Sequence, residues 1–113
     1  MRVKTTVPSK RRKNKLLKQT KGFWGQRKNV YRRAKETLLR SLAFSYRDRK
    51  AKKRTMRSLW ISRINAALRE EGFTYSKFMH TLKTKDIHLD RKILAEMASE
   101  HPEKFKQLLN SIN

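Results

Sequence analysis

The sequence lacks cysteine altogether, has only three glycines and two prolines, and contains no long apolar run. Without cysteine the chain has no disulfide, no thiolate metal site and no cysteine nucleophile, which fits a reducing compartment. No apolar stretch approaches the roughly 18 residues of a membrane-spanning helix. The basic start Met1-Arg2-Val3-Lys4 also lacks the apolar stretch of a secretory signal. We therefore expect a cytoplasmic protein without a membrane partner.

Acidic side chains are almost missing from the first half of the chain. Residues 1–60 hold 22 of the 31 Lys and Arg and only two acidic residues, Glu36 and Asp48, a net charge of +20. Residues 61–113 carry nine basic and seven acidic side chains, a net charge of +2. Like charges repel when a chain becomes compact, so the first half needs an anionic partner. A polyphosphate backbone meets this need, because each Lys or Arg placed on a phosphate releases condensed counterions.

Residues that carry catalysis or bind metals form no recognisable motif. His80, His88 and His101 have neither the spacing nor the cysteine partners of a zinc site. Glu70 and Glu71 are adjacent, so their side chains would point apart on a helix. A glycine-rich phosphate loop, a nucleophile elbow and an HExxH motif are all missing from the sequence. We expect no enzyme activity, no cofactor, no metal and no small-molecule substrate.

Residues 1–25 are predicted to form a basic, RNA-binding arm. The segment after Pro8 has so few apolar side chains that burial cannot offset its ordering entropy, so we expect it to be disordered alone in water. The phosphate contacts expected from this arm are Lys10, Arg11, Arg12, Lys13, Lys15, Lys18 and Lys21.

Two glycines bracket two aromatic residues at Gly22-Phe23-Trp24-Gly25. The glycines let the backbone bend and approach a surface closely, and the rings offer flat faces. In one interpretation Trp24 contacts a base or ribose; in the other the aromatic pair is a staple against the protein's own core. Both interpretations stay open at this point.

A single long helix is predicted between Gly25 and Gly72, where the chain has neither glycine nor proline. Such a helix would span about 70 Å at about 1.5 Å per residue. A thin apolar stripe at Tyr31, Ala34, Leu38 and Leu42 is lost past Tyr46. Residues 47–54 are basic all round, which favours a helix ordered by phosphates on several sides.

Arginine outnumbers lysine in this helix from Arg32 to Arg63. The planar guanidinium makes paired hydrogen bonds to phosphate oxygens, which indicates a defined docking geometry. Interleaved tyrosines suit RNA, whose unstacked bases and 2′-hydroxyls are exposed. The contacts expected from residues 26–63 are Arg27, Tyr31, Arg32, Arg33, Arg40, Tyr46, Arg47, Arg49, Lys50, Lys53, Arg54, Arg57, Trp60 and Arg63.

Residues 57–113 are predicted to form a small all-α domain. Gly72 should end the long helix, Thr74 and Asp90 should cap two further helices, and Pro102 suits a first helical position. The residues expected to face inward are Trp60, Ile61, Ile64, Ala67, Leu68, Tyr75, Phe78, Met79, Leu82, Ile93, Leu94, Met97, Phe105, Leu108, Leu109 and Ile112. The expected fold class is all-α, with an extended basic arm (1–25), a long basic helix (26–56) and a small helical bundle (57–113).

Several motifs resemble a known family. They are Lys21-Gly22-Phe23-Trp24-Gly25, Tyr31-Arg32-Arg33-Ala34-Lys35, Tyr46-Arg47-Asp48-Arg49-Lys50, Lys53-Arg54, Gly72-Phe73-Thr74-Tyr75-Ser76-Lys77-Phe78, Asp90-Arg91-Lys92-Ile93-Leu94-Ala95 and the highly specific Leu59-Trp60-Ile61-Ser62-Arg63-Ile64-Asn65-Ala66-Ala67. Together they cover nearly the whole chain and resemble bacterial large-subunit ribosomal protein twenty, the bL20 family.

The resemblance implies a basic arm, a long bent helix threaded through 23S ribosomal RNA, and a helical C-terminal domain also on that RNA. It implies a place among neighbouring large-subunit ribosomal proteins and a role in early assembly of the large subunit, without a part in peptidyl transfer. Some members also bind their own messenger RNA and repress translation. The matching motifs place Arg47, Arg49, Arg54, Arg57, Trp60, Arg63 and Asn65 at RNA. Glu71, where an uncharged polar residue is common, and His101, where Asp is usual, depart from the family pattern.

Two other functions are compatible with parts of the sequence. A DNA-binding nucleoid-type architectural protein would share the charge and the arm, and Phe23 and Trp24 could wedge into a minor groove. Basic side chains all round a helix argue against it, because duplex DNA offers only one side at a time. A lytic helix on a membrane surface needs a broad apolar face, which residues 47–54 lack.

Overall fold

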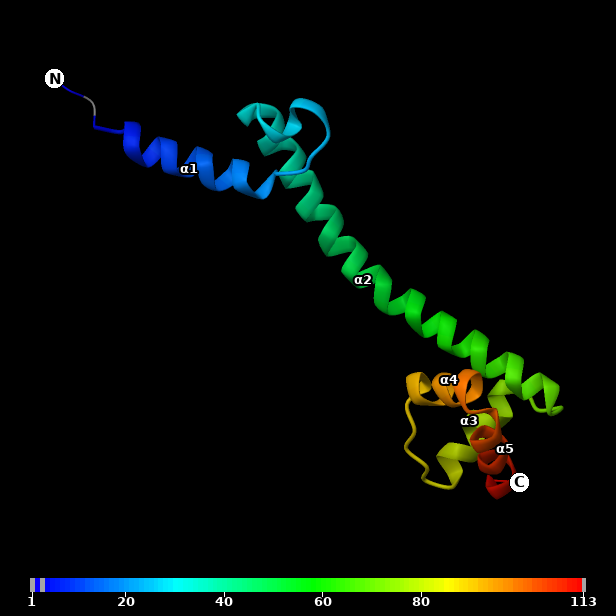
Figure 1. Cartoon of the computed structure of the whole chain (residues 1–113). Helices are drawn as coiled ribbons and strands as arrows, with labels where there is room; N and C mark the ends of the chain where they lie inside the picture. Colours follow the sequence, from blue (N-terminus) through cyan, green and yellow to red (C-terminus); the bar gives the residue numbers. More distant parts are fainter. Residues whose placement is uncertain (1, 3, 113) are drawn as a thin grey trace. The chain divides into compact units, whose positions relative to one another are not determined.

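The computed structural model describes residues 2 and 4–112, and these form helices and short connections without a strand. The elements are α1 (Thr6–Gln19), a 3-10 turn (Gly25–Lys28), α2 (Tyr31–Glu70), α3 (Tyr75–Thr84), α4 (Arg91–Glu100) and α5 (Pro102–Ile112) (Figure 1). The predicted all-α class, with one very long helix and a C-terminal helical group, is confirmed. The chain divides into two compact units, Met1–Lys50 and Ala51–Asn113.

The arm contains a helix, α1, where the sequence led us to expect disorder. Pro8 lies in its first turn, where a missing N–H costs no helical hydrogen bond. At the other end Leu16 and Leu17 are half-buried, and Thr20 is fully buried. The single hydroxyl proton of Thr20 is shared between the carbonyl oxygens of Leu17 (3.1 Å) and Lys28 (3.3 Å). The end of α1 is therefore anchored on the turn that follows it.

The long helix begins at Tyr31, so the prediction that it begins at residue 26 was wrong. Residues 25–28 form a 3-10 turn instead, and the N–H groups of Asn29 and Val30 both donate to the carbonyl of Gln26, at 3.1 and 2.9 Å. Gly25 has φ 60, which a residue with a side chain rarely adopts. A stretch without glycine or proline permits a helix, but it does not determine where the helix begins.

The end of α2 lies where Gly72 predicts it. Gly72 has φ 77, its N–H donates to the Arg69 carbonyl (3.2 Å), and the Phe73 N–H donates to the Leu68 carbonyl (2.8 Å). These two bonds form a Schellman motif, which occupies carbonyls that the helix end leaves unpaired. Thr74 and Asp90 precede α3 and α4 as predicted, although neither side chain makes a capping hydrogen bond. Pro102 is the first residue of α5, as expected.

The core of unit 51–113 is built by α2, α3, α4 and α5. Its buried residues are Ile64, Leu68, Phe78, Leu82, Leu94, Ala95, Phe105, Leu109 and Ile112. Trp60, Tyr75, Met79, Met97 and Leu108 pack against them half-buried. Ile93 is 45% exposed, so its predicted inward position was wrong. Leu94 is buried as predicted, and Ala95 is buried beside it. Ile93 lies about 100° from Leu94 and about 200° from Ala95 around the helix, so it points away from the core.

Unit 1–50 has a much smaller buried interior. Among its described residues Ala34 and Thr20 are fully buried, and Tyr31 and Leu38 are half-buried. Leu42, the last residue of the thin apolar stripe, is 56% exposed, so the stripe is buried only in its first part. None of the described helices is long and apolar enough to cross a membrane.

Candidate nucleic-acid interface

The predicted contact residues lie mostly at the surface. Those on α1 and the following loop, and most of those on α2, are exposed: Lys10, Arg11, Arg12, Lys13, Lys15, Lys18, Lys21, Trp24, Arg32, Arg33, Arg40, Tyr46, Arg47, Arg49, Lys50, Lys53, Arg54, Arg57 and Arg63. Four others, Arg27, Tyr31, Trp60 and Asn65, are half-buried. These positions are accessible to a partner, and their contacts with RNA stay a prediction.

Basic side chains cover most of the circumference of α2 between residues 47 and 54. Successive residues of a helix are about 100° apart, so the basic residues of this segment cover about 220° of the helix circumference. They are Arg47, Arg49, Lys50, Lys52, Lys53 and Arg54, and the remaining arc carries Asp48 and Ala51. All six are exposed. A helix segment with so little apolar surface gains nothing from packing on protein. Its charge is best neutralised by anions on more than one side.

The two acidic residues of the first half neutralise little of this charge. Glu36 pairs with Arg40 at 3.0 Å and Asp48 with Arg47 at 2.9 Å, and all four side chains are largely exposed. Exposed pairs of this kind contribute about 0–1 kcal/mol. Two pairs among so many cations leave the surface strongly positive.

Aromatic rings on α2 lie beneath cations. The Arg47 guanidinium lies over the Phe44 ring at 4.7 Å, and the Lys50 ammonium over the Tyr46 ring at 5.6 Å. Both rings are exposed. Each pair offers a positive charge and a flat face together, a combination that suits a phosphate with its stacked base.

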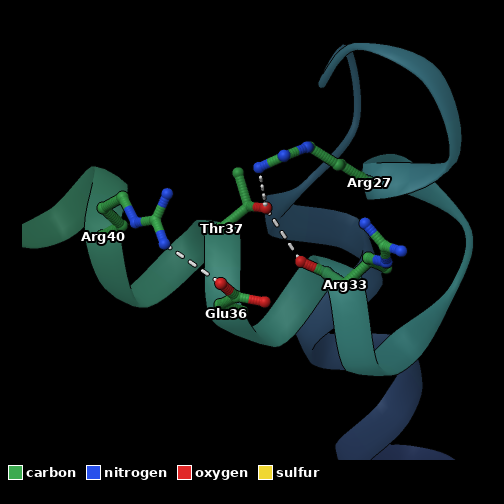
Figure 2. A network of polar contacts seen from close by, with 5 residues as sticks. All are labelled: Arg27, Arg33, Glu36, Thr37 and Arg40. Atoms are coloured by element: carbon green, nitrogen blue, oxygen red, sulfur yellow. Dashed lines mark hydrogen bonds and ion pairs between the residues drawn. The ribbon is translucent and has the colours of Figure 1, made fainter.

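Two half-buried residues have contacts within the protein. Trp60 packs against the core of unit 51–113, so the predicted packing is confirmed, while its contact with RNA stays a prediction. Arg27 reaches from the 3-10 turn to α2, where its Nη1 donates to the Thr37 hydroxyl at 3.2 Å (Figure 2). The same hydroxyl donates to the Arg33 carbonyl at 2.8 Å, so the guanidinium is held in place by a bonded partner.

The structure distinguishes the two aromatic residues between the glycines. Phe23 is half-buried, whereas Trp24 is 87% exposed. Trp24 is therefore not a staple against the protein's own core. Of the two interpretations, the one that leaves its ring available to a partner agrees with the structure.

Sequence reasoning missed several exposed residues of this surface. Lys28, Lys35 and Lys52 are exposed cations, and basicity alone could have indicated them. Gln26 and Val30 line a cleft together with Trp24. No pattern in the sequence signals this cleft, because the 3-10 turn that forms it was predicted as helix.

The C-terminal unit carries one ion pair that involves a departure from the family pattern. The Lys106 ammonium lies 3.0 Å from a Glu71 carboxylate oxygen. This hydrogen bond, reinforced by the attraction of the charges, raises the pKa of Lys106 above its ordinary value of 10.5. The pair links α5 to the connection that follows α2.

The fold and surface define a class: an all-α protein with its positive charge concentrated on one long helix and on the segment that precedes it.

Comparison with known proteins specifies that class. The family described as Ribosomal protein L20 matches residues 2–108. "Large ribosomal subunit protein bL20" of Malacoplasma penetrans (strain HF-2) is 50% identical over 112 residues, 99% of this chain and 97% of the relative. The protein of the same name in Flavobacterium johnsoniae (strain UW101) is 50% identical over 107 residues, 95% of this chain and 94% of the relative. The chain belongs to the ribosomal protein L20 family.

Proposed function

We propose that this chain is a structural constituent of the large ribosomal subunit that binds 23S ribosomal RNA directly. In this proposal α1, the loop after it and the basic part of α2 contact phosphates and unpaired bases, and neighbouring large-subunit proteins are further partners. The family supports the ribosomal role, and the surface supports the RNA contact.

The observation that carries the proposal is the broad band of exposed cations at residues 47–54, which covers about 220° of the circumference of α2. Folded RNA encloses a helix and presents phosphates on several sides, whereas a straight DNA duplex lies against one side. A nucleoid-type architectural role would leave part of this charge without a partner.

The resemblance to the family extends the proposal to early assembly of the large subunit. A strongly basic segment neutralises phosphates that would otherwise repel one another as RNA segments come together. The chain contributes no group to peptidyl transfer in this proposal. Repression of its own messenger RNA stays a prediction of the resemblance.

Competition binding tests the proposal. The full chain is bound to 23S ribosomal RNA transcribed in vitro, and a DNA duplex of equal total charge competes at near-physiological salt. We expect strong preference for the RNA, since surface geometry adds to charge. Equal competition by the duplex would contradict RNA recognition and favour the architectural role. Crosslinking of the tagged chain in its host, with sequencing of the captured RNA, would then identify the segments bound.

A further inference from the structure

An open cleft lies beside the exposed Trp24, within unit 1–50. Its lining comes from the 3-10 turn, the residue before it and the first part of α2, namely Trp24, Gln26, Arg27, Val30 and Arg33. The volume, about 440 Å³, lies within the usual range of about 300–1,000 Å³ for small-ligand sites. The lining combines an indole face, an aliphatic side chain, an amide and two guanidinium groups.

The backbone around Trp24 is shaped to present its ring. Gly22 and Gly25 have φ 87 and 60, in the left-handed region that residues with side chains rarely adopt. Phe23 between them is half-buried, and its N–H donates to the Thr20 carbonyl at 3.1 Å. One aromatic ring is thus anchored while the other, 87% exposed, faces outward. Val30, 45% exposed, lines the same cleft, so the ring and this side chain together give the cleft an exposed apolar wall.

The two arginines give the cleft a fixed positive charge. Arg27 is held by the Thr37 hydroxyl at 3.2 Å, a bond that occupies one of the five N–H donors of its guanidinium. Figure 2 shows the Arg33 side chain extending toward the turn that carries Arg27. The acidic side chain on this part of α2, Glu36, binds Arg40 at 3.0 Å and does not line the cleft. The lining therefore has two positive charges and no negative one.

We propose that this cleft binds one unpaired nucleotide of ribosomal RNA. The base stacks on the Trp24 ring and against Val30, and the Gln26 amide pairs with polar atoms of the base edge. The phosphate accepts hydrogen bonds from Arg27 and Arg33. The proposal rests on the proposed function, and specifies a single-nucleotide site within it. An acidic peptide would satisfy the guanidinium groups but would leave the indole face without a stacking partner.

Binding of full-length variants to 23S ribosomal RNA tests the site. Trp24→Ala should weaken binding about tenfold, the effect of losing one base–aromatic stack, and Trp24→Phe should lose less because a flat ring remains. Arg33→Gln should weaken binding more than Arg32→Gln, which removes the same charge from an exposed neighbour outside the cleft. Circular dichroism checks that α1 and α2 persist in each variant.

The outcomes separate this site from the proposed function. If the parent chain binds the RNA and Trp24→Ala binds equally well, the nucleotide site is refuted and RNA binding stands. If the parent chain shows no preference for the RNA, both proposals fail. Crosslinking from ribosomes that contain the Trp24→benzoylphenylalanine variant adds a direct readout. We expect an adduct with RNA, whereas an adduct only with a ribosomal protein would overturn the nucleotide site in favour of a protein partner.

Discussion

Trp60 joins the basic part of α2 to the core of unit 51–113. Its ring packs half-buried against a cluster that includes Ile64 and Leu68, while Arg57 and Arg63 beside it are exposed. Side chains three or four residues apart share a helix face, so Trp60 and Ile64 lie on the side that faces the core. The structure therefore shows that Trp60 contributes to stability by packing against this core.

Replacement of Trp60 by Ala should destabilise the full chain by about 2 kcal/mol, the lower end of large-to-small core changes, because the ring is only half-buried. Trp60→Phe should recover much of this loss, since it restores most of the buried ring. Urea unfolding followed by circular dichroism measures both. Arg57→Ala is the control and should leave the midpoint nearly unchanged. An unaltered midpoint for Trp60→Ala would refute the packing role.

Glu71 and Lys106 give a second residue-scale prediction, on pH. The pKa of Lys106 is raised, first by its hydrogen bond to Glu71, so the pair stabilises the folded chain at pH values below about 10.5. That stabilisation disappears as the pH rises through the higher folded-state pKa, where the ammonium loses its proton. An NMR titration should find the pKa of Lys106 above 10.5 and should find it lowered by Glu71→Gln.

Glu103→Gln is the matched control for this titration. Glu103 also raises the pKa of Lys106, but only through a weaker charge attraction without a hydrogen bond. Its removal should lower the pKa less than removal of Glu71 does. Equal effects of the two substitutions would show that the 3.0 Å hydrogen bond is not the main cause.

At the scale of the helices, the sequence predicts the C-terminal elements closely. Gly72 and Pro102 each determine a backbone conformation locally, so the end of α2 and the start of α5 lie where they indicate. Apolar spacing predicts Phe78, Leu82, Leu94 and Phe105 as core residues, and all four are buried. These features depend on local geometry and on a period that the sequence shows directly.

The N-terminal elements could not be predicted in the same way. The end of α1 is anchored by the Thr20 hydroxyl, which lies 3.3 Å from the Lys28 carbonyl oxygen, eight residues further along the chain. Residues 25–28 form a 3-10 turn, so α2 begins only after it. The same turn contributes Gln26 and Arg27 to the cleft beside Trp24. Composition indicates that these segments are basic, but it does not determine such contacts.

Arginine chemistry on α2 gives a prediction at this scale. Arg49→Lys keeps the charge but replaces a planar fork of donors by a single ammonium, so affinity for 23S ribosomal RNA should fall while its salt dependence stays the same. Lys13→Ala, on α1, should instead weaken binding slightly and reduce the salt slope by about one unit, as expected for one phosphate contact. Affinity measured across a range of salt concentrations distinguishes the two. If Arg49→Lys binds like the parent, paired hydrogen bonds at this position are excluded.

At the scale of the whole molecule, charge and core are concentrated in different parts of the chain. Residues 1–50 hold 18 of the 31 basic side chains and two of the nine acidic ones. The hydrophobic cluster, by contrast, comes entirely from residues 60–112. Removal of residues 1–50 should therefore lower the affinity for RNA while the C-terminal unit stays folded.

A fragment of residues 51–113 should fold by itself, because every residue of the hydrophobic cluster is retained in it. It should unfold cooperatively in urea and should keep the helical signal of α3, α4 and α5.

The affinity of this fragment for 23S ribosomal RNA should fall steeply. The slope of log affinity against log salt should drop by more than half, since each lost phosphate contact removes about 0.7–0.9 of a unit and most cations are gone. The complementary Trp60→Ala fragment, which keeps the charge of 51–113, should lose stability without a further change in slope. A fragment that retains the parent's salt slope would show that the phosphate contacts come from residues 51–113, and that the concentration of charge in residues 1–50 does not determine binding.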